Sequence, residues 1–390
     1  PLVMLVDGAI TELGQVPEVV PILSTSLDGD LQTDWELWAG NLLIAGVNYR
    51  WLTYISDLNT PRRTNQHRAG GYVHLEQRLW QSLLFSLGMR LDYNSITPMT
   101  FSPRAAIVWR VNPSHALRLS AGQAFRKPSF FNTSFRLNAV EGSGVTPSLG
   151  EFFEDSIANP DLKNEGVTSV ETGYRGSFLD GGLVLETNVF LSLFSDNIGF
   201  DTDMQTTDLG LPDLANSTVR FVNRKGDTYS VGGSASATVR VRPTLFLSAN
   251  YTCRHTWFEE LDEDDIQQPT SVMRSEPAHL ANAWVLIRPG QGLRLGLAFG
   301  LRSSYSQYVA GRGGLFDDWS RVGVPLSTVL SGFAAWRLAL SRGWLELGVR
   351  AFDLGDQRYR ETTGTQRFDG ANQGGALLGR KVWLFARGAL

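Results

Sequence analysis

The residues of this sequence best suited to catalysis or metal binding are its five histidines. They are scattered without the spacing that metal ligands require, at His67, His74, His115, His255 and His279. No group of the Ser/His/Asp type converges on one end of the predicted strands. The sequence therefore predicts no enzyme active site, no metal site and no cofactor.

Three other stretches could bind an ion or an anionic group. The acidic cluster EELDEDD, residues 259–265, could hold Ca²⁺, but its spacing matches no EF-hand and favours a solvated loop. The glycines of GRGG, residues 311–314, lack the strand-to-helix context of a phosphate-binding loop. Arg126 in AFRKP is a candidate for contacting an anionic substrate, with a structural role as the alternative.

The composition narrows the class of protein. The chain has 390 residues, 40 glycines and a net charge of −4. This charge gives no basic surface of the kind that binds nucleic acid. Its one cysteine, Cys253, excludes an intrachain disulfide. Apolar runs stay short of the roughly 20 residues of a membrane helix, so any crossing of a membrane would use strands.

Long segments alternate polar and apolar residues with a period of two, which predicts β-strands with two different faces. From Tyr229 to Arg242, one face is Tyr, Val, Gly and Ala, and the other is mainly Ser, Thr and Arg. Strands of this length suit tilted membrane strands of about 9–11 residues. The apolar residues predicted to face lipid include Leu183, Leu185, Val189, Leu191, Leu293, Leu295, Leu297 and Phe299, and the polar residues predicted to face inward include Glu186, Asn188, Arg294 and Arg302.

The connections between the predicted strands alternate between short and long. Short turns are expected at 39–42, 80–82, 112–114, 179–181, 243, 289–291 and 341–343. Long polar stretches are expected at 53–68, 94–102, 126–166, 195–227, 258–277, 304–323 and 354–376. Outer-membrane barrels have this asymmetry, with long outer loops and tight periplasmic turns. The pattern predicts an all-β, antiparallel transmembrane barrel portion of about fifteen strands, from near Leu31 to a last strand at 377–387.

Aromatic residues gather where strands meet turns or loops, as expected of the interfacial girdles of a membrane barrel. Those at short turns are Trp38, Trp80, Phe178 and Trp344, and those at long loops are Trp51, Tyr93, Phe125, Phe194 and Trp257. In the strand from Thr168 to Phe178, this architecture places Glu171 and Arg175 inside. Charge is tolerated there because the interior of such a barrel is polar.

Three stretches of the sequence resemble the barrel of TonB-dependent outer-membrane receptors. LRLSAGQAFRKPSF, residues 117–130, resembles a strand followed by the family's Ala-Phe-Arg-x-Pro motif, here with Phe125, Arg126 and Pro128. NPDLKNEGVTSVETGYRGSF, residues 159–178, resembles a second motif, carried by Asn159, Pro160, Leu162, Glu165, Ser169, Glu171, Gly173 and Tyr174. FDLGDQRY and GRKVWLFA resemble the exit of the penultimate strand and the closing strand. Asp353 stands where the family usually has Asn.

The resemblance implies the C-terminal portion of a barrel of about 22 strands. Residues 31–390 would form that portion, and residues 1–30 an outer loop or strand stub. The first residues, PLVMLVDG, lack the features of a signal peptide, which predicts either a protein that is not exported or a chain whose beginning lies upstream.

The resemblance also implies a function. The expected protein is an outer-membrane receptor that imports a scarce small molecule, such as a ferric siderophore, a cobalamin or a glycan. Its partners would be outer-membrane lipid and a TonB-type energy-coupling protein that acts through a region upstream of this chain. The alternatives are an ungated porin and, from another class, a barrel enzyme.

Overall fold

The computed structural model describes residues 3–6, 9–12, 23–56, 61–134, 158–206, 212–258, 277–290, 292–310, 319–357, 359–360 and 377–389. The described chain is almost entirely β-structure, as predicted, with one short helix, α1 (Phe130–Ser134). Fifteen strands form one antiparallel sheet. They are β3 (Leu23–Trp35), β4 (Asn41–Ile55), β5 (Arg63–Leu79), β6 (Leu83–Asn94), β7 (Thr100–Asn112), β8 (His115–Arg126), β9 (Glu165–Phe178), β10 (Leu183–Ser195), β13 (Thr228–Arg242), β14 (Leu245–Phe258), β15 (His279–Gly290), β16 (Leu293–Arg302), β19 (Ser327–Ala339), β20 (Trp344–Phe352) and β23 (Lys381–Ala389).

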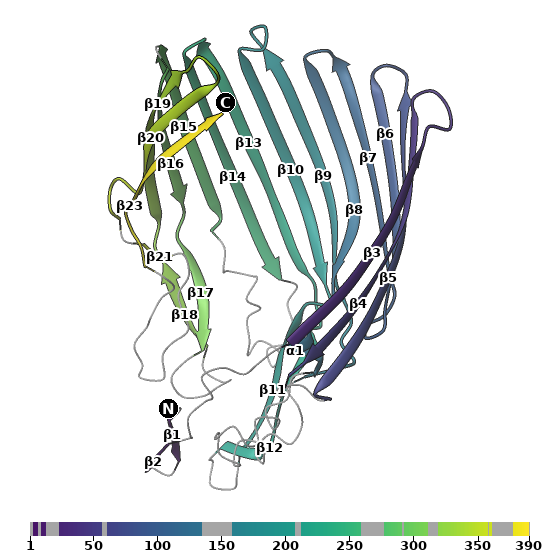
Figure 1. Cartoon of the computed structure of the whole chain (residues 1–390). Helices are drawn as coiled ribbons and strands as arrows, with labels where there is room; N and C mark the ends of the chain where they lie inside the picture. The colour runs from purple at the N-terminus through teal and green to yellow at the C-terminus, as the bar shows by residue number, and fades with distance from the viewer. Residues whose placement is uncertain are drawn as a thin grey trace.

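The sheet is strongly curved, with β3 at one edge and β23 at the other (Figure 1). These two strands do not pair with each other, as predicted for part of a larger barrel. The short turns lie together at one rim, and α1 and the small hairpins lie at the opposite rim (Figure 1). Among the described residues, no helix is long and apolar enough to span a membrane.

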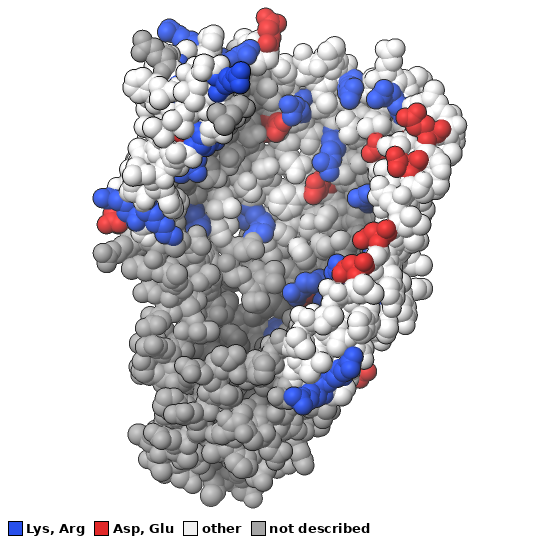
Figure 2. Space-filling model, in the orientation of Figure 1, with Lys and Arg blue, Asp and Glu red and all other residues white. Residues whose placement is uncertain are grey.

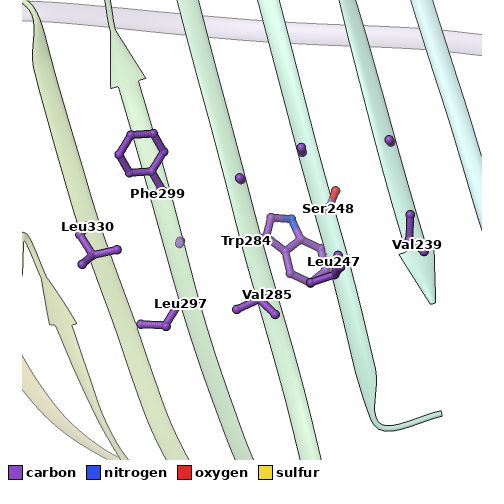
Figure 3. Close-up of a pocket in the computed structure, with 12 residues that line it drawn as sticks. Val239, Leu247, Ser248, Trp284, Val285, Leu297, Phe299 and Leu330 are labelled. Carbon is purple, nitrogen blue, oxygen red and sulfur yellow. The ribbon is translucent and has the colours of Figure 1, made fainter. Parts of the chain in front are cut away.

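The predicted faces of the strands are confirmed by the register. Val189 pairs with Thr172 and Gly233, and its neighbour Asn188 pairs with Gly173 and Ser234, so apolar and polar rows run separately across the sheet. The outward row is exposed in the chain alone, with Val189 at 54% and Leu297 at 51%. A shallow apolar groove of about 390 Å³ follows this outward face (Figure 3). Its labelled lining includes Val239, Leu247, Val285, Leu297, Phe299 and Leu330.

The long connections differ from the prediction, because several contain further strands. The stretch 195–227 holds the hairpin β11 (Ile198–Thr206) and β12 (Pro212–Asn223), and 304–323 holds β17 (Tyr305–Ala310) and most of β18 (Trp319–Val324). Smaller pairs are β1 (Val3–Val6) with β2 (Ala9–Glu12), and β21 (Tyr359–Arg360) with β22 (Leu377–Leu378). The first strand of the large sheet also begins at Leu23 rather than near Leu31. Polar composition had suggested loops at these places, but hairpin pairing satisfies their backbone groups.

The short turns lie where they were predicted, and two devices make them tight. Gly40 and Gly181 have φ values of 78° and 82°, which glycine adopts without steric cost. Trp80, Leu179 and Asp180 also have positive φ values, of 57°, 52° and 51°, which non-glycine residues adopt at some cost.

Most of the predicted girdle aromatics share the outward face, but two do not. Trp80 is 80% exposed and Tyr93 is 51% exposed on the outside. Phe194 and Trp344 point inward. Phe194 is two residues after the inward-facing Ser192 on β10, and Trp344 is two residues before the inward-facing Glu346 on β20. Position near a strand end therefore did not decide which face these two rings occupy.

Candidate functional site: the charged inner wall

The inner face of the sheet carries the charged side chains. On this hollowed face, basic and acidic residues are mixed over the strands from β3 to β10, at the right of the view (Figure 2). Basic residues prevail at the left of the view, over the last strands of the sheet (Figure 2). The pattern follows from the alternation of the strands, which sends every second residue inward. Because this face would line the lumen of a barrel, it is the surface that any transported molecule would meet.

Charged and polar side chains form hydrogen bonds along and across the strands from β3 to β6. Arg90 of β6 donates through Nε and Nη2 to the two carboxylate oxygens of Asp92, each at 2.7 Å, and Nη2 also donates to Asn48 Oδ1 at 2.7 Å. Nearer the short-turn rim, the Tyr72 hydroxyl donates to Gln32 Oε1 at 2.6 Å. This part of the wall is therefore held by hydrogen bonds between its own side chains.

The predicted inward pair Glu171 and Arg175 lies on the same wall, further round the sheet. Arg175 Nη1 donates to Glu186 Oε1 of β10 at 2.5 Å, and Glu171 lies 3.8 Å from Arg118 of β8. Between β5 and β9 the wall forms a hollow of about 580 Å³, which Glu171 lines together with Arg104. Charge in the middle of this strand therefore belongs to a lumenal surface.

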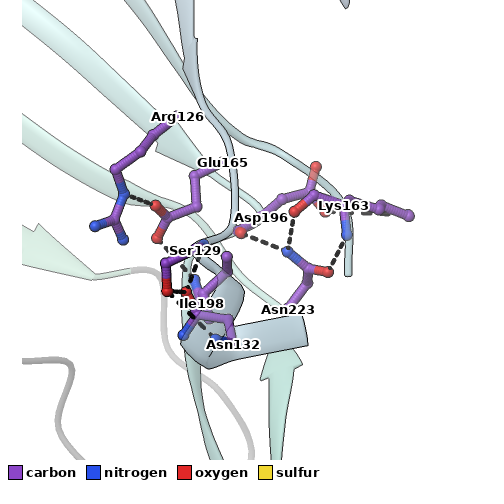
Figure 4. A network of polar contacts seen from close by, with 8 residues as sticks. All are labelled: Arg126, Ser129, Asn132, Lys163, Glu165, Asp196, Ile198 and Asn223. Carbon is purple, nitrogen blue, oxygen red and sulfur yellow. Dashed lines mark hydrogen bonds and ion pairs between the residues drawn. The ribbon is translucent and has the colours of Figure 1, made fainter. Parts of the chain in front are cut away.

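The motif residues near the long-loop rim form a second network (Figure 4). Arg126 is paired with Glu165, its neighbour across β8 and β9, and Glu165 Oε1 accepts the backbone N–H of Ile198 at 2.8 Å. Asn159 Nδ2 donates to the carbonyl of Phe221 at 2.8 Å. These bonds attach the β11–β12 hairpin to the barrel rim. Arg126 is thus held in a structural contact, although its side chain is still 74% exposed.

A third set of bonds in this network surrounds Asn223 at the end of β12. Its Oδ1 accepts the N–H of Lys163 at 2.7 Å, and its Nδ2 donates to the carbonyls of Lys163 at 3.1 Å and Asp196 at 2.8 Å (Figure 4). In the loop after β8, Ser129 donates its hydroxyl to Asn132 Oδ1 at 2.6 Å. The stretch that carries the second motif therefore links the β11–β12 hairpin to the strands β9 and β10 by hydrogen bonds.

The other motif residues are placed by the same strands. Phe125 and Tyr174 have outward parity on β8 and β9, and Gly173 faces inward beside Asn188. Pro128 follows β8, and Pro160 follows Asn159 in the segment that leads into β9.

Two further basic residues near the long-loop rim, Lys127 and Arg254, were not singled out from the sequence. Burial lowers the pKa of the Lys127 ammonium, and the nearby Arg68 guanidinium lowers it further, while Asp92 acts in the opposite direction. Arg254 and Arg302 reach the same rim from β14 and β16. Arg254 and Arg302 both have the inward parity of their strands, which is predictable from the sequence.

The remaining sequence candidates are separated or lie outside the described residues. No group of three or more His, Cys, Asp or Glu side chains that could hold a metal is found in the described part of the chain. The segments 259–265 and 311–314 lie outside it.

The model of the family "TonB dependent receptor-like, beta-barrel" matches residues 13–377. The chain belongs to this family. TonB-dependent receptors are transporters of the bacterial outer membrane rather than enzymes, and this is the location of the present barrel portion. The resemblance that its motifs suggested is confirmed.

Two curated relatives are similar in sequence, and both are the "Iron-regulated outer membrane virulence protein" of Vibrio cholerae serotype O1. The protein of the El Tor strain is 26% identical over 216 residues, which cover 55% of this chain and 30% of the relative. The protein of the classical strain is 23% identical over 214 residues, with the same coverage. The chain thus matches less than a third of the length of these relatives.

Solved structures show the same fold at low sequence identity. The FrpB iron transporter of Neisseria meningitidis has a TM-score of 0.68 at 15% identity, covering 94% of this chain and 55% of its own. The ferric enterobactin receptor of Pseudomonas aeruginosa has a TM-score of 0.67 at 16% identity, covering 94% and 53%. The siderophore receptor PirA of Acinetobacter baumannii has a TM-score of 0.64 at 14% identity, covering 94% and 54%. The present chain spans about half of these receptors.

Proposed function

We propose that this barrel belongs to an active importer of an iron–siderophore complex. The family match carries the proposal, because TonB-dependent receptors are outer-membrane transporters. Relatives named for iron regulation, iron transport and ferric enterobactin favour iron over a cobalamin or a glycan. The chain from β3 onward would be the C-terminal part of the barrel, and energy would come through a TonB-type partner acting on another part of the receptor.

The charge of the inner wall supports an anionic cargo. In the strands β13, β14, β15, β16, β19, β20 and β23, Glu346 is the only acidic residue against ten basic ones. Ferric chelates built on catecholate or carboxylate oxygens carry negative charge, and Arg guanidinium groups recognise such oxygens. Arg254 and Arg302, near the long-loop rim, are the residues of this wall that such a chelate would meet first.

Uptake of radioactive iron by cells that carry the protein in its natural membrane tests this function. We expect uptake of a ferric siderophore to stop when the proton motive force is collapsed. Entry that continues unchanged would instead identify an ungated porin, and energised uptake of cobalamin or a glycan alone would replace the substrate class.

A double variant tests whether the basic residues of the inner wall contribute to uptake. Arg254→Gln with Arg302→Gln should weaken uptake at low substrate concentration, whereas the matched change Arg175→Gln in the balanced half should leave it near normal. Equal effects of the two would show that the basic half of the wall has no special part in transport.

A further inference from the structure

Two places at the long-loop side of the outward face carry the same arrangement of a tyrosine and a histidine, and a third pair, Tyr174 with His115 Nδ1 at 2.8 Å, lies at the short-turn side. On β4 and β5, the Tyr49 hydroxyl lies 2.7 Å from His67 Nδ1, with the ring centroids 6.3 Å apart. On β14 and β15, the Tyr251 hydroxyl lies 2.7 Å from His279 Nδ1, with the centroids 6.0 Å apart. Both imidazoles are exposed. The two sites come from distant parts of the chain, so the likeness is one of geometry.

A serine fixes the backbone of each histidine in the same way. The N–H of His67 donates to Ser95 Oγ at 3.0 Å, and the N–H of Ser95 donates back to the His67 carbonyl at 3.0 Å. His279 and Ser303 repeat this exchange at 3.1 Å and 2.9 Å. Each serine directly follows the end of the adjacent strand, β6 or β16. The imidazole is therefore held from the backbone and from Nδ1.

Both histidines lie just beyond the apolar band of the barrel, at the long-loop side. His67 is twelve residues from Leu79 at the short-turn end of β5, since 79 − 67 = 12, and His279 is eleven from Gly290, since 290 − 279 = 11. At about 3.3 Å per residue and a tilt of about 40°, these separations correspond to about 28–30 Å along the barrel axis, against a band about 25 Å tall. That height is the level of lipid headgroups.

The neighbouring outward side chains are apolar or aromatic. Val47 lies on the same row of β4 as Tyr49, and Tyr93 of β6 lies on the outward row beside His67. Around the second pair, Cys253 lies opposite His279, and Ala281 lies opposite Tyr251. The acyl chains of a lipid would therefore lie on the apolar rows below, with the headgroup at the imidazole.

From this geometry we infer that the Tyr49–His67 and Tyr251–His279 pairs are binding sites for the phosphate of a membrane lipid headgroup. In the tautomer that we assign to both histidines, the tyrosine hydroxyl donates to Nδ1 and the imidazole proton lies on Nε2. Nε2 then donates to a phosphate oxygen, a strong acceptor. The acyl chains occupy the apolar outward rows, which makes the ligand a lipid phosphate and not a free one.

Lipid binding to the protein purified from its own outer membrane tests the assignment. Native mass spectrometry would count bound dioleoylphosphatidylglycerol against digalactosyldiacylglycerol, which has no phosphate. We expect a preference for the phospholipid, and we expect the double variant His67→Phe/His279→Phe to reduce phospholipid binding about tenfold, as for the loss of one hydrogen bond to a charged group at each site. Tyr49→Phe with Tyr251→Phe, which keeps both imidazoles but leaves them unpositioned, should lower binding by less.

His255→Phe is the matched control. His255 is also exposed on the outward face, but it stacks on Trp257 at 5.7 Å. Its replacement should leave the preference intact. An unchanged preference in the double histidine variant, an equal loss in His255→Phe, or full displacement of the lipid by inorganic phosphate alone would each overturn the assignment. Retained barrel migration in unheated gel samples shows that a variant is folded.

Discussion

The two halves of the sheet balance their charges differently. The strands from β3 to β10 contain eight acidic residues (Asp28, Asp30, Asp34, Glu76, Asp92, Glu165, Glu171 and Glu186) and ten basic ones (Arg50, Arg63, Arg68, Arg78, Arg90, Arg104, Arg110, Arg118, Arg126 and Arg175). The strands of the large sheet from β13 to β23 contain one acidic residue, Glu346, and also ten basic ones (Arg240, Arg242, Arg254, Arg288, Arg294, Arg302, Arg337, Arg350, Lys381 and Arg387).

In the basic half, one carboxylate serves several guanidinium groups. Glu346 of β20 is 0% exposed. Its Oε1 accepts from Arg387 Nε at 2.7 Å, and its Oε2 accepts from Arg337 Nε at 3.1 Å and lies 3.2 Å from Arg294 Nη1. The cluster joins four strands, β16, β19, β20 and β23. In the balanced half, pairs such as Arg175 with Glu186 join two strands and stay exposed, at 67% and 48%.

This difference in burial predicts how strongly the stability of each half depends on its ion pairs. Exposed pairs are worth about 0–1 kcal/mol, because water and salt already solvate both partners. A buried carboxylate among three arginines is another case, since removing its charge leaves three cations close together without their common partner. The balanced half should tolerate the loss of one pair, and the basic half should not tolerate the loss of Glu346.

The largest expected effect is therefore that of Glu346→Gln. We expect the free energy of unfolding to fall by about 3–5 kcal/mol, as for other buried ion clusters that lose one partner. Glu186→Gln is the same change in the balanced half, and it should cost less than about 1 kcal/mol. Denaturant titration of both variants in lipid vesicles measures the two values. Similar costs would show that the two halves do not differ in this way.

The next effect concerns the two faces, at the junction of the two halves. Val189→Arg would place a charge on the outward row of β10 and should cost about 2–4 kcal/mol at the depth of the membrane centre. Ser234→Arg on the neighbouring β13 would place the same charge on the inner face, beside Asn188, and should cost much less. Refolding both variants into vesicles measures the asymmetry. Equal costs would mean that both faces of the sheet meet water.

The sequence predicts the faces well, because alternation is a property of single strands. Glu186 and Val189 could be assigned to opposite faces without knowing any partner strand. The Glu346 cluster could not be predicted, since Arg294 and Arg387 are far apart in the chain and meet only through the register of four strands. The β11–β12 hairpin was missed for a related reason, because its anchor Glu165 contacts the backbone of Ile198 rather than a recognisable side-chain motif.

The smallest expected effect concerns Asp353, a second buried acid, which directly follows β20. Asp353 is 0% exposed like Glu346, but its Oδ2 has no hydrogen-bond partner among the described residues. Its Oδ1 accepts the N–H of Gln357 at 3.2 Å, and its φ of 54° is one that Asn and Asp adopt more readily than other non-glycine residues. Asp353→Asn keeps both features and removes the buried charge.

We expect Asp353→Asn to raise the free energy of unfolding by about 1 kcal/mol, because a buried charge with one unpartnered oxygen costs more than a neutral amide in the same place. Asp353→Ala loses the bond to Gln357 and adopts the positive φ less readily, so it should lower stability. The same denaturant titration compares the two. If Asn destabilises as much as Ala, Oδ2 has a cationic partner in the native membrane, and the basic half would contain a second acid that its charges require.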